Sequence, residues 1–121
     1  MTENIQARLK QARNLWIATV RPDGRPHLTP VWFVIEGEHL LICISTGSVK
    51  AGNLQANDRV ACALEDGNSP VIFEGRGRTI EQPWPETALA AFKDKYDWEL
   101  AADLDYGLLI ELEPEKWLTW Q

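Results

Sequence analysis

Three short apolar runs, separated by two compact turns, dominate the first half of the sequence and limit the folds open to it. Each run is rich in β-branched or aromatic residues, which favour strands. The runs are LWIATV at 15–20, HLTPVWFVI at 27–35 and HLLICIS at 39–45, and the turns are RPDGRP at 21–26 and EGE at 36–38. Turns as tight as Asp23-Gly24 join antiparallel neighbours, so the pattern predicts two successive hairpins in an antiparallel meander.

The second half of the chain continues with strand-like runs and short helical segments. We expect strands at 59–65, 70–80, 106–113 and 116–120, and helices at 3–12, 49–56 and 86–96, with Thr2 and Ser48 as N-caps and Pro85 in the first turn of the third helix. Residues 97–105 fit either a loop or another short helix. Gly75 and Gly77 indicate a bulge, a bend or close backbone approach within their strand. Six or seven strands with short helices predict a mainly β, closed or partly closed barrel in a single domain, 1–121.

Composition excludes several classes of protein. The net charge is -6 and no Lys/Arg-rich run is present, so the sequence lacks the footprint of a nucleic-acid-binding protein. It also lacks a long apolar span and a signal-peptide core, and we expect a cytoplasmic protein without membrane partners. Cys43 and Cys62 lie inside apolar runs and are predicted to be buried, reduced thiols. His27 and His39 stand alone, which argues against a metal site.

The segment STGSVKAGNL at 45–54 combines groups that bind phosphate. It offers the hydroxyls of Ser45, Thr46 and Ser48, backbone amides around Gly47, and the ammonium of Lys50. Amides at a helix start point at an anion and the helix dipole favours negative charge there. On its own, the string is explained better by a capped helix with a solvated lysine, because serine caps helices routinely.

The order of these features resembles one known family. Over 15–80 the chain has a strand, a G-x-P hairpin, PVWF at 30–33, STGSVKAGNL at 45–54, NDRVA at 57–61 and EGRGR at 74–78. This succession resembles the pyridoxamine 5'-phosphate oxidase-like superfamily, the FMN-binding split β-barrels. The last third of the chain is similar only in outline, with a helix, a strand and a final tryptophan-rich strand.

The resemblance implies a split antiparallel β-barrel that forms a homodimer with two cofactor sites at its interface. It implies FMN, or the related deazaflavin F420, as the cofactor, while some relatives bind haem. The flavin ring would lie along Leu28, Thr29, Pro30, Val31, Trp32 and Phe33, and the cofactor tail would approach Cys43 and Ile44. Ser48, Val49 and Lys50 would form the phosphate-binding turn, and Trp117 or Trp120 from the second subunit would cover the ring.

Some positions depart from the pattern of the pyridoxamine-phosphate oxidases. Leu28 and Phe33 stand where those enzymes have Arg and Lys beside the ring, and Val49 stands where they have Arg before the phosphate lysine. Their basic C-terminal substrate motif is replaced by PEKWLTWQ. Each missing cation removes a charge-assisted contact to phosphate or flavin. The sequence therefore argues against oxidation of pyridoxamine phosphate.

Three functions remain open at this stage. The first is a flavin- or F420-dependent oxidoreductase acting on a small redox substrate, in which the cofactor supplies the chemistry. The second is a non-catalytic module that stores a flavin or carries electrons. The third is a haem-binding relative, for which only His27 and His39 offer a nitrogen ligand. No side chain is an evident general acid or base, and a solvated turn residue explains His27 better than a catalytic one, because a lone histidine has no positioned partner.

Overall fold

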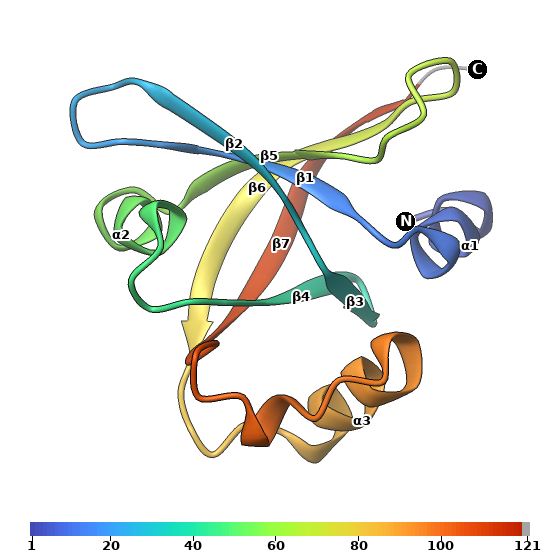
Figure 1. The fold of residues 1–121 in the computed structure, drawn as a ribbon. Helices are drawn as coiled ribbons and strands as arrows, with labels where there is room; N and C mark the ends of the chain where they lie inside the picture. The colour runs from blue at the N-terminus through green and yellow to red at the C-terminus, as the bar shows by residue number, and fades with distance from the viewer. Residues whose placement is uncertain (120–121) are drawn as a thin grey trace.

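The computed structural model describes residues 1–119. It contains, in chain order, α1 (Glu3–Gln11), β1 (Leu15–Val20), β2 (Pro26–Val31), β3 (Phe33–Glu36), β4 (His39–Ile44), α2 (Val49–Ala56), β5 (Arg59–Ala63), β6 (Val71–Ile80), α3 (Glu86–Tyr96), a single 3-10 turn η1 (Leu100–Ala102) and β7 (Leu108–Thr119). The seven strands form one antiparallel sheet in the order β2-β1-β5-β6-β7-β4-β3, curled into a half-barrel (Figure 1). The predicted mainly β fold with short helices is confirmed.

The predicted strand over 27–35 is interrupted at Trp32, and this break changes the topology. β2 pairs with β1, whereas β3 pairs with β4 and with no other strand of the described residues, so the two hairpins lie at opposite ends of the sheet. The expected continuous meander is therefore wrong at this point. Because the chain passes directly from one end of the sheet to the other at Trp32, it brings the two edges together and curls the sheet.

The two strands predicted at 106–113 and 116–120 are one long strand, β7, which pairs with both β4 and β6. The pairing register of β6 with β7 shifts between Glu74 and Gly75. A Cβ atom on Gly75 would collide with the carbonyl oxygen of Glu113 and lie 2.9 Å from its carbonyl carbon. Two of the three alternatives expected from the glycines, the bulge and the close backbone approach, occur at Gly75.

Apolar side chains fill both faces of β4. Leu40 and Ile42 belong to the core inside the curled sheet, together with Phe33 and Phe73. Leu41 and Cys43, with their side chains on the other face of β4, belong to a second core that includes Phe92 of α3. Successive side chains on a strand point to opposite faces. The continuous apolar run HLLICI therefore reflects a strand covered by the barrel interior on one side and by α3 on the other.

The helix ends follow the predicted capping chemistry. The side chain of Thr2 accepts a hydrogen bond from the Ile5 N–H at 3.1 Å, and that of Ser48 accepts one from the Ala51 N–H at 3.2 Å. Pro85 lies one residue before α3, at the N-cap. None of the helices within residues 1–119 is both long and apolar enough to cross a membrane.

Candidate functional site

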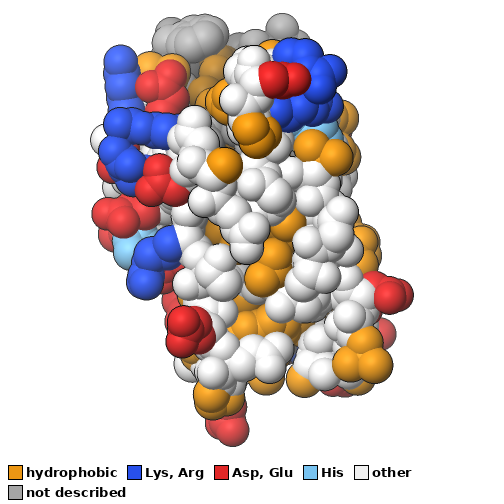
Figure 2. Space-filling view, turned by 90° about the vertical axis from the view of Figure 1, so that its left-hand side faces the viewer, with side chains coloured by type: hydrophobic (Ala, Val, Ile, Leu, Met, Phe, Trp, Pro, Cys, Tyr) orange, Lys and Arg blue, Asp and Glu red, His pale blue; other side chains and the backbone are white. Residues whose placement is uncertain are grey.

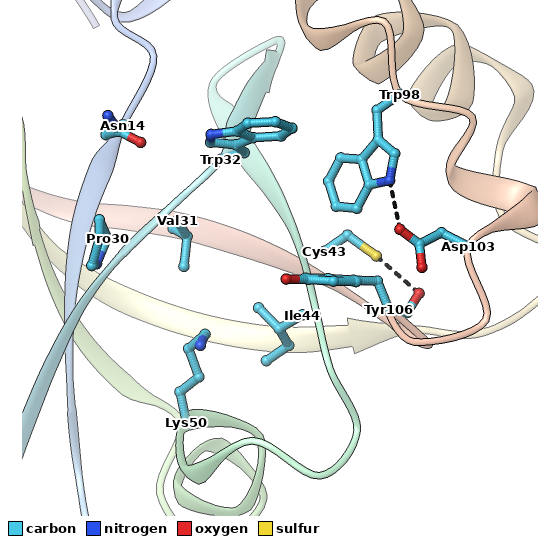
Figure 3. Close-up of a pocket in the computed structure, with 10 residues that line it drawn as sticks. All are labelled: Asn14, Pro30, Val31, Trp32, Cys43, Ile44, Lys50, Trp98, Asp103 and Tyr106. Carbon is cyan, nitrogen blue, oxygen red and sulfur yellow. Dashed lines mark hydrogen bonds between the residues drawn. The ribbon is translucent and has the colours of Figure 1, made fainter.

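A cavity of about 400 Å³ lies beside the break between β2 and β3, within the size range of small-molecule sites. β2, β4 and the first turn of α2 form one side of it, and the segment after α3 forms the other (Figure 3). Its lining residues are Asn14, Pro30, Val31, Trp32, Cys43, Ile44, Lys50, Trp98, Asp103 and Tyr106.

Trp32 forms an aromatic wall of this cavity. Its ring stacks on that of Tyr96, with the centroids 4.4 Å apart and the planes at 7°, although 43% of the residue stays exposed. The Tyr96 hydroxyl accepts a hydrogen bond from the backbone N–H of Phe33, the residue next to Trp32. α3 therefore fixes both the indole and the backbone at the point where the chain changes direction.

The opposite wall comes from the segment between α3 and β7. Trp98 lies edge-on to both Trp32 and Tyr106, with centroids 5.6 and 5.2 Å apart. Its indole Nε1–H donates to the Asp103 carboxylate at 2.9 Å, and the Cys43 thiol donates to the Tyr106 carbonyl at 3.4 Å. These contacts, drawn in Figure 3, fasten an irregular segment against β4.

Lys50 extends from the first turn of α2 to the cavity (Figure 3). Burial lowers the pKa of its ammonium group. Within residues 1–119 it forms no ion pair with an acidic side chain. The helix is held in place by Asn53, whose side-chain amide donates to the hydroxyl of Thr19 on β1 at 3.0 Å, with both residues buried. Asp103 also lines the cavity but lies beyond ion-pair distance of Lys50, so this half-buried cation is suited to an anionic ligand.

The hydroxyl of Ser48, by contrast, is already engaged. It donates to the Ser45 carbonyl at 2.8 Å and accepts the Ala51 N–H. A serine hydroxyl has one proton. Ser48 therefore shapes the turn before α2, and its side chain would have to rotate before it could donate to an anion.

Two polar atoms on β2 are buried without a hydrogen-bond partner in the described part of the chain, Nδ1 of His27 and Oγ1 of Thr29. Leaving such atoms unpaired is costly, so they commonly bind a ligand or water. Burial, helped by the positive charges of Arg21 and Lys50, lowers the pKa of His27 and favours its neutral form. His27 is thus a half-buried strand residue, not the solvated turn residue that the sequence allowed.

The cysteines lack the properties of reactive or metal-binding thiols. Burial, reinforced by the nearby charge of Asp103, raises the pKa of Cys43 to about 12. Burial likewise raises the pKa of Cys62, and both are free thiols. Since the thiolate is the nucleophile and the ligand, Cys43 acts at neutral pH as a hydrogen-bond donor and a packing group.

The structure brings together half of the residues predicted for the cofactor site. Pro30, Val31, Trp32, Cys43, Ile44 and Lys50 line the cavity. The other five described residues do not line it, although each is next in sequence to a residue that does or close to one. Leu28 is exposed, the hydroxyl of Thr29 is buried, Phe33 lies in the core, and Ser48 and Val49 precede Lys50. Trp120 lies outside the described residues.

Asn14, Trp98, Asp103 and Tyr106 were not predicted as site residues. Three of them lie in or beside 97–105, where the sequence allowed a loop or a helix and no periodic pattern indicated which side chains point inward. No sequence pattern sets Trp98 apart from Trp84, Trp117 and Trp120, which also lie in the last third of the chain. Asn14 precedes β1, and its amide donates to Glu65 at 3.3 Å.

Comparison with known proteins identifies the family. The pyridoxamine 5'-phosphate oxidase family model matches residues 1–121, whereas no curated protein matches the sequence. Among solved structures, an F420 reductase is 27% identical with a TM-score of 0.79, and the match covers 98% of each chain. The protein Rv2991 from Mycobacterium tuberculosis is 26% identical with a TM-score of 0.81, covering 99% of this chain and 84% of that one.

The heme storage protein HutZ from Vibrio cholerae shares the fold at 22% identity and a TM-score of 0.81, with 97% of this chain and 93% of HutZ covered. The similarity therefore extends beyond residues 15–80, on which the resemblance was first based, into the last third of the chain. The sequence match and the curled antiparallel sheet agree, and the chain belongs to the pyridoxamine 5'-phosphate oxidase family.

Proposed function

We propose that the cavity beside Trp32 binds a flavin-type cofactor, FMN or F420, and that the protein is an oxidoreductase acting on a small redox substrate. The observation that carries this proposal is Lys50, a half-buried cation that lines an aromatic-walled cavity without an acidic partner in the described residues. The similarity to an F420 reductase over nearly the whole chain supports the same choice of cofactor.

The residues present fit such a ligand in three respects. Lys50 offers a charge to an anionic tail, while Trp32 and Tyr106 offer aromatic surface to a planar ring. His27 and Thr29 do not line the cavity, but they lie on the same strand as Pro30 and Val31, and the Thr29 hydroxyl and His27 Nδ1 are buried without partners inside the described chain. The cavity volume of about 400 Å³ suits a cofactor that is only partly enclosed.

When bound, a flavin or deazaflavin supplies hydride or electron transfer. The protein would hold and orient it. Lys50 would bind the anionic tail, and the Trp32 and Tyr106 rings would exclude water from the planar part. The protonated Cys43 thiol would stay chemically inert there, since it donates to the Tyr106 carbonyl and holds that segment in place.

Oxidation of pyridoxamine phosphate is not the reaction we propose. Leu28 and Val49 are exposed apolar residues and Phe33 is fully buried, so none supplies the cation that those oxidases have at these positions. Lys50 is the only lysine or arginine among the described residues that line the cavity. One cation suffices for a cofactor tail but leaves none for a second phosphate on the substrate.

We also propose that the working unit is a two-fold homodimer that encloses the cofactor. Leu28 and Val49 are 61% and 50% exposed, although both are apolar. Figure 2 shows the side of the molecule that carries the β1–β2 hairpin and α2, and hydrophobic side chains are visible in its middle while charged ones gather mainly toward its margins. Such a surface is suited to burial against a second copy.

Spectroscopy of the purified protein tests the proposed function. The visible spectrum is recorded as purified, and the protein is then titrated with FMN, F420 and haem in turn. Saturable binding of FMN or F420 near one per chain, followed by turnover with a chemical reductant and an acceptor, would support the oxidoreductase. Binding without turnover would favour a storage or electron-carrying module. Preferential binding of haem would contradict the proposal.

A further inference from the structure

A second cavity of about 380 Å³ lies on the far side of the segment that walls the first. It is formed between the start of α3 and the chain around η1. Its lining residues are Gln82, Pro83, Trp84, Leu89, Leu100, Ala101, Asp103, Leu104, Tyr106 and Gly107. Asp103 and Tyr106 line both cavities, so these two residues separate one from the other.

Asp103 gives this mostly apolar cavity its charge. It is the only Asp, Glu, Lys or Arg among the described residues that line the cavity. Its carboxylate accepts hydrogen bonds from the Trp98 indole at 2.9 Å and from the Asp105 N–H at 3.2 Å. Within residues 1–119 it forms no ion pair with a cationic side chain. Two accepted bonds leave about half of a carboxylate's lone-pair positions free.

Aromatic and aliphatic side chains line the same cavity as Asp103. Trp84 and Tyr106 present rings to the cavity, and Leu89 and Leu100 present apolar surface. Aromatic faces attract cations through the ring quadrupole, most strongly where water is excluded. From this combination we infer that the second cavity binds an organic cation with an apolar body, such as a substituted ammonium, and that Asp103 is its counter-charge.

Other classes of ligand fit less well. A neutral apolar molecule would cover the free lone pairs of Asp103 without replacing the water that binds them, which is costly. An anion would be repelled by the same carboxylate. Magnesium and calcium require several oxygen ligands, whereas this wall offers one carboxylate amid apolar groups.

Because Asp103 and Tyr106 line both cavities, a ligand of the second cavity would lie beside the proposed cofactor. An organic cation in the second cavity would contact Asp103 and Tyr106 from one side, and a ligand of the first cavity would contact them from the other. This extension, in which the cation is the substrate of the oxidoreductase, rests on the proposed function. Binding of the cation itself does not.

Isothermal titration with three small probes tests the inference. Benzyltrimethylammonium carries the charge and an apolar body, 2-phenylethanol is neutral, and phenylacetate is an anion. The cation should bind at least tenfold more tightly than either of the others. Equal binding of the cation and the alcohol, or no heat from the cation up to tens of millimolar, would overturn the inference.

Two substitutions that each remove one negative charge test whether Asp103 is the binding residue. Asp103→Asn keeps an oxygen for the Trp98 indole but removes the charge, and should weaken binding of the cation at least tenfold. Asp105→Asn removes the same charge from an exposed neighbour and should leave the affinity unchanged. Equal effects of the two would show that only the general negative charge attracts the probe, and would contradict the assignment of Asp103.

A third substitution keeps the test valid if Asp103→Asn fails to fold. Trp84→Leu retains apolar surface and removes the aromatic face, so it should weaken binding of the cation by several-fold more than binding of 2-phenylethanol. An equal loss for both probes would count against the inference. FMN titration of the same samples separates the two proposals, because either ligand can bind without the other.

Discussion

The hydroxyl oxygen of Tyr96 lies 3.0 Å from both the backbone nitrogen and the carbonyl oxygen of Phe33. It lies 2.8 Å from the carbonyl oxygen of Arg13 as well. A phenol accepts from the N–H and has one proton to donate to either carbonyl. β3 is an edge strand, so this hydroxyl satisfies backbone groups that have no neighbouring strand. It fixes the chain directly after Trp32, where the cavity begins.

Tyr96→Phe should destabilise the protein by about 1–3 kcal/mol, because it leaves the buried Phe33 N–H without an acceptor while keeping the ring that stacks on Trp32. Urea denaturation measures the change. Tyr106→Phe is the matched control, since Tyr106 is more exposed and no hydrogen bond of its hydroxyl occurs within the described residues. Equal stabilities of the two variants would refute this role of Tyr96.

The contact between Tyr96 and Phe33 also shows which part of the fold could not be predicted from the sequence. The two hairpin turns and the caps at Thr2 and Ser48 depend on neighbours in the chain, and these predictions are confirmed. The break at Trp32 depends on Tyr96, which is 64 residues further along, and nothing in HLTPVWFVI indicates it.

The candidate site shows a similar division between local and distant contacts. Its residues on β2, β4 and α2 could be assigned because they belong to a continuous pattern that resembles a known family. Asp103 and Tyr106 could not, because hydrogen bonds to Trp98 and Cys43 place an irregular segment against the sheet. Such contacts leave no periodic signal in a sequence.

Gly75→Ala should destabilise the protein by about 1–3 kcal/mol or more, because the added methyl group would collide with the backbone of Glu113 rather than with a movable side chain. Gly77→Ala should cost less, since its nearest neighbours are the side chains of Ile110 and Leu112 at 3.2 and 3.3 Å. Gly67→Ala meets nothing within 4 Å and should be nearly neutral. Thermal unfolding of the three variants would contradict this account if Gly75→Ala were as stable as Gly67→Ala.

Lys95 should make stability depend on pH at the alkaline end. Burial, with the nearby charge of Arg13, lowers the pKa of its ammonium to about 8, whereas in the unfolded chain it is about 10.4. Between these values the unfolded state binds more protons, so the free energy of unfolding contributed by this group rises as the pH rises from 8 to about 10.4. Below pH 8 the contribution is constant and unfavourable.

The variant Lys95→Met isolates this contribution, because subtracting its unfolding free energy removes the titration of the other groups. The difference, wild type minus variant, should rise through that pH window. Two contacts of the ammonium oppose the shift: Nζ lies 3.8 Å from the centroid of the Phe33 ring and donates to the Leu9 carbonyl at 3.3 Å. A difference that stays flat from pH 8 to 10.5 would mean that these contacts offset burial.

Lys50→Ala should weaken FMN binding by about 1.5–3 kcal/mol, the scale of a hydrogen bond to a charged group, or roughly 10- to 100-fold in Kd. Because burial lowers the Lys50 pKa, the wild-type affinity should also begin to fall at a lower pH than for an exposed lysine, as the ammonium loses its proton. Fluorescence titration from pH 8 to 10.5 measures both effects. Lys10→Ala removes an equal charge from an exposed position of α1 and should change neither. Wild-type affinity in Lys50→Ala, with the Lys10→Ala control also unchanged, would remove Lys50 from the site and the main support from the proposed function.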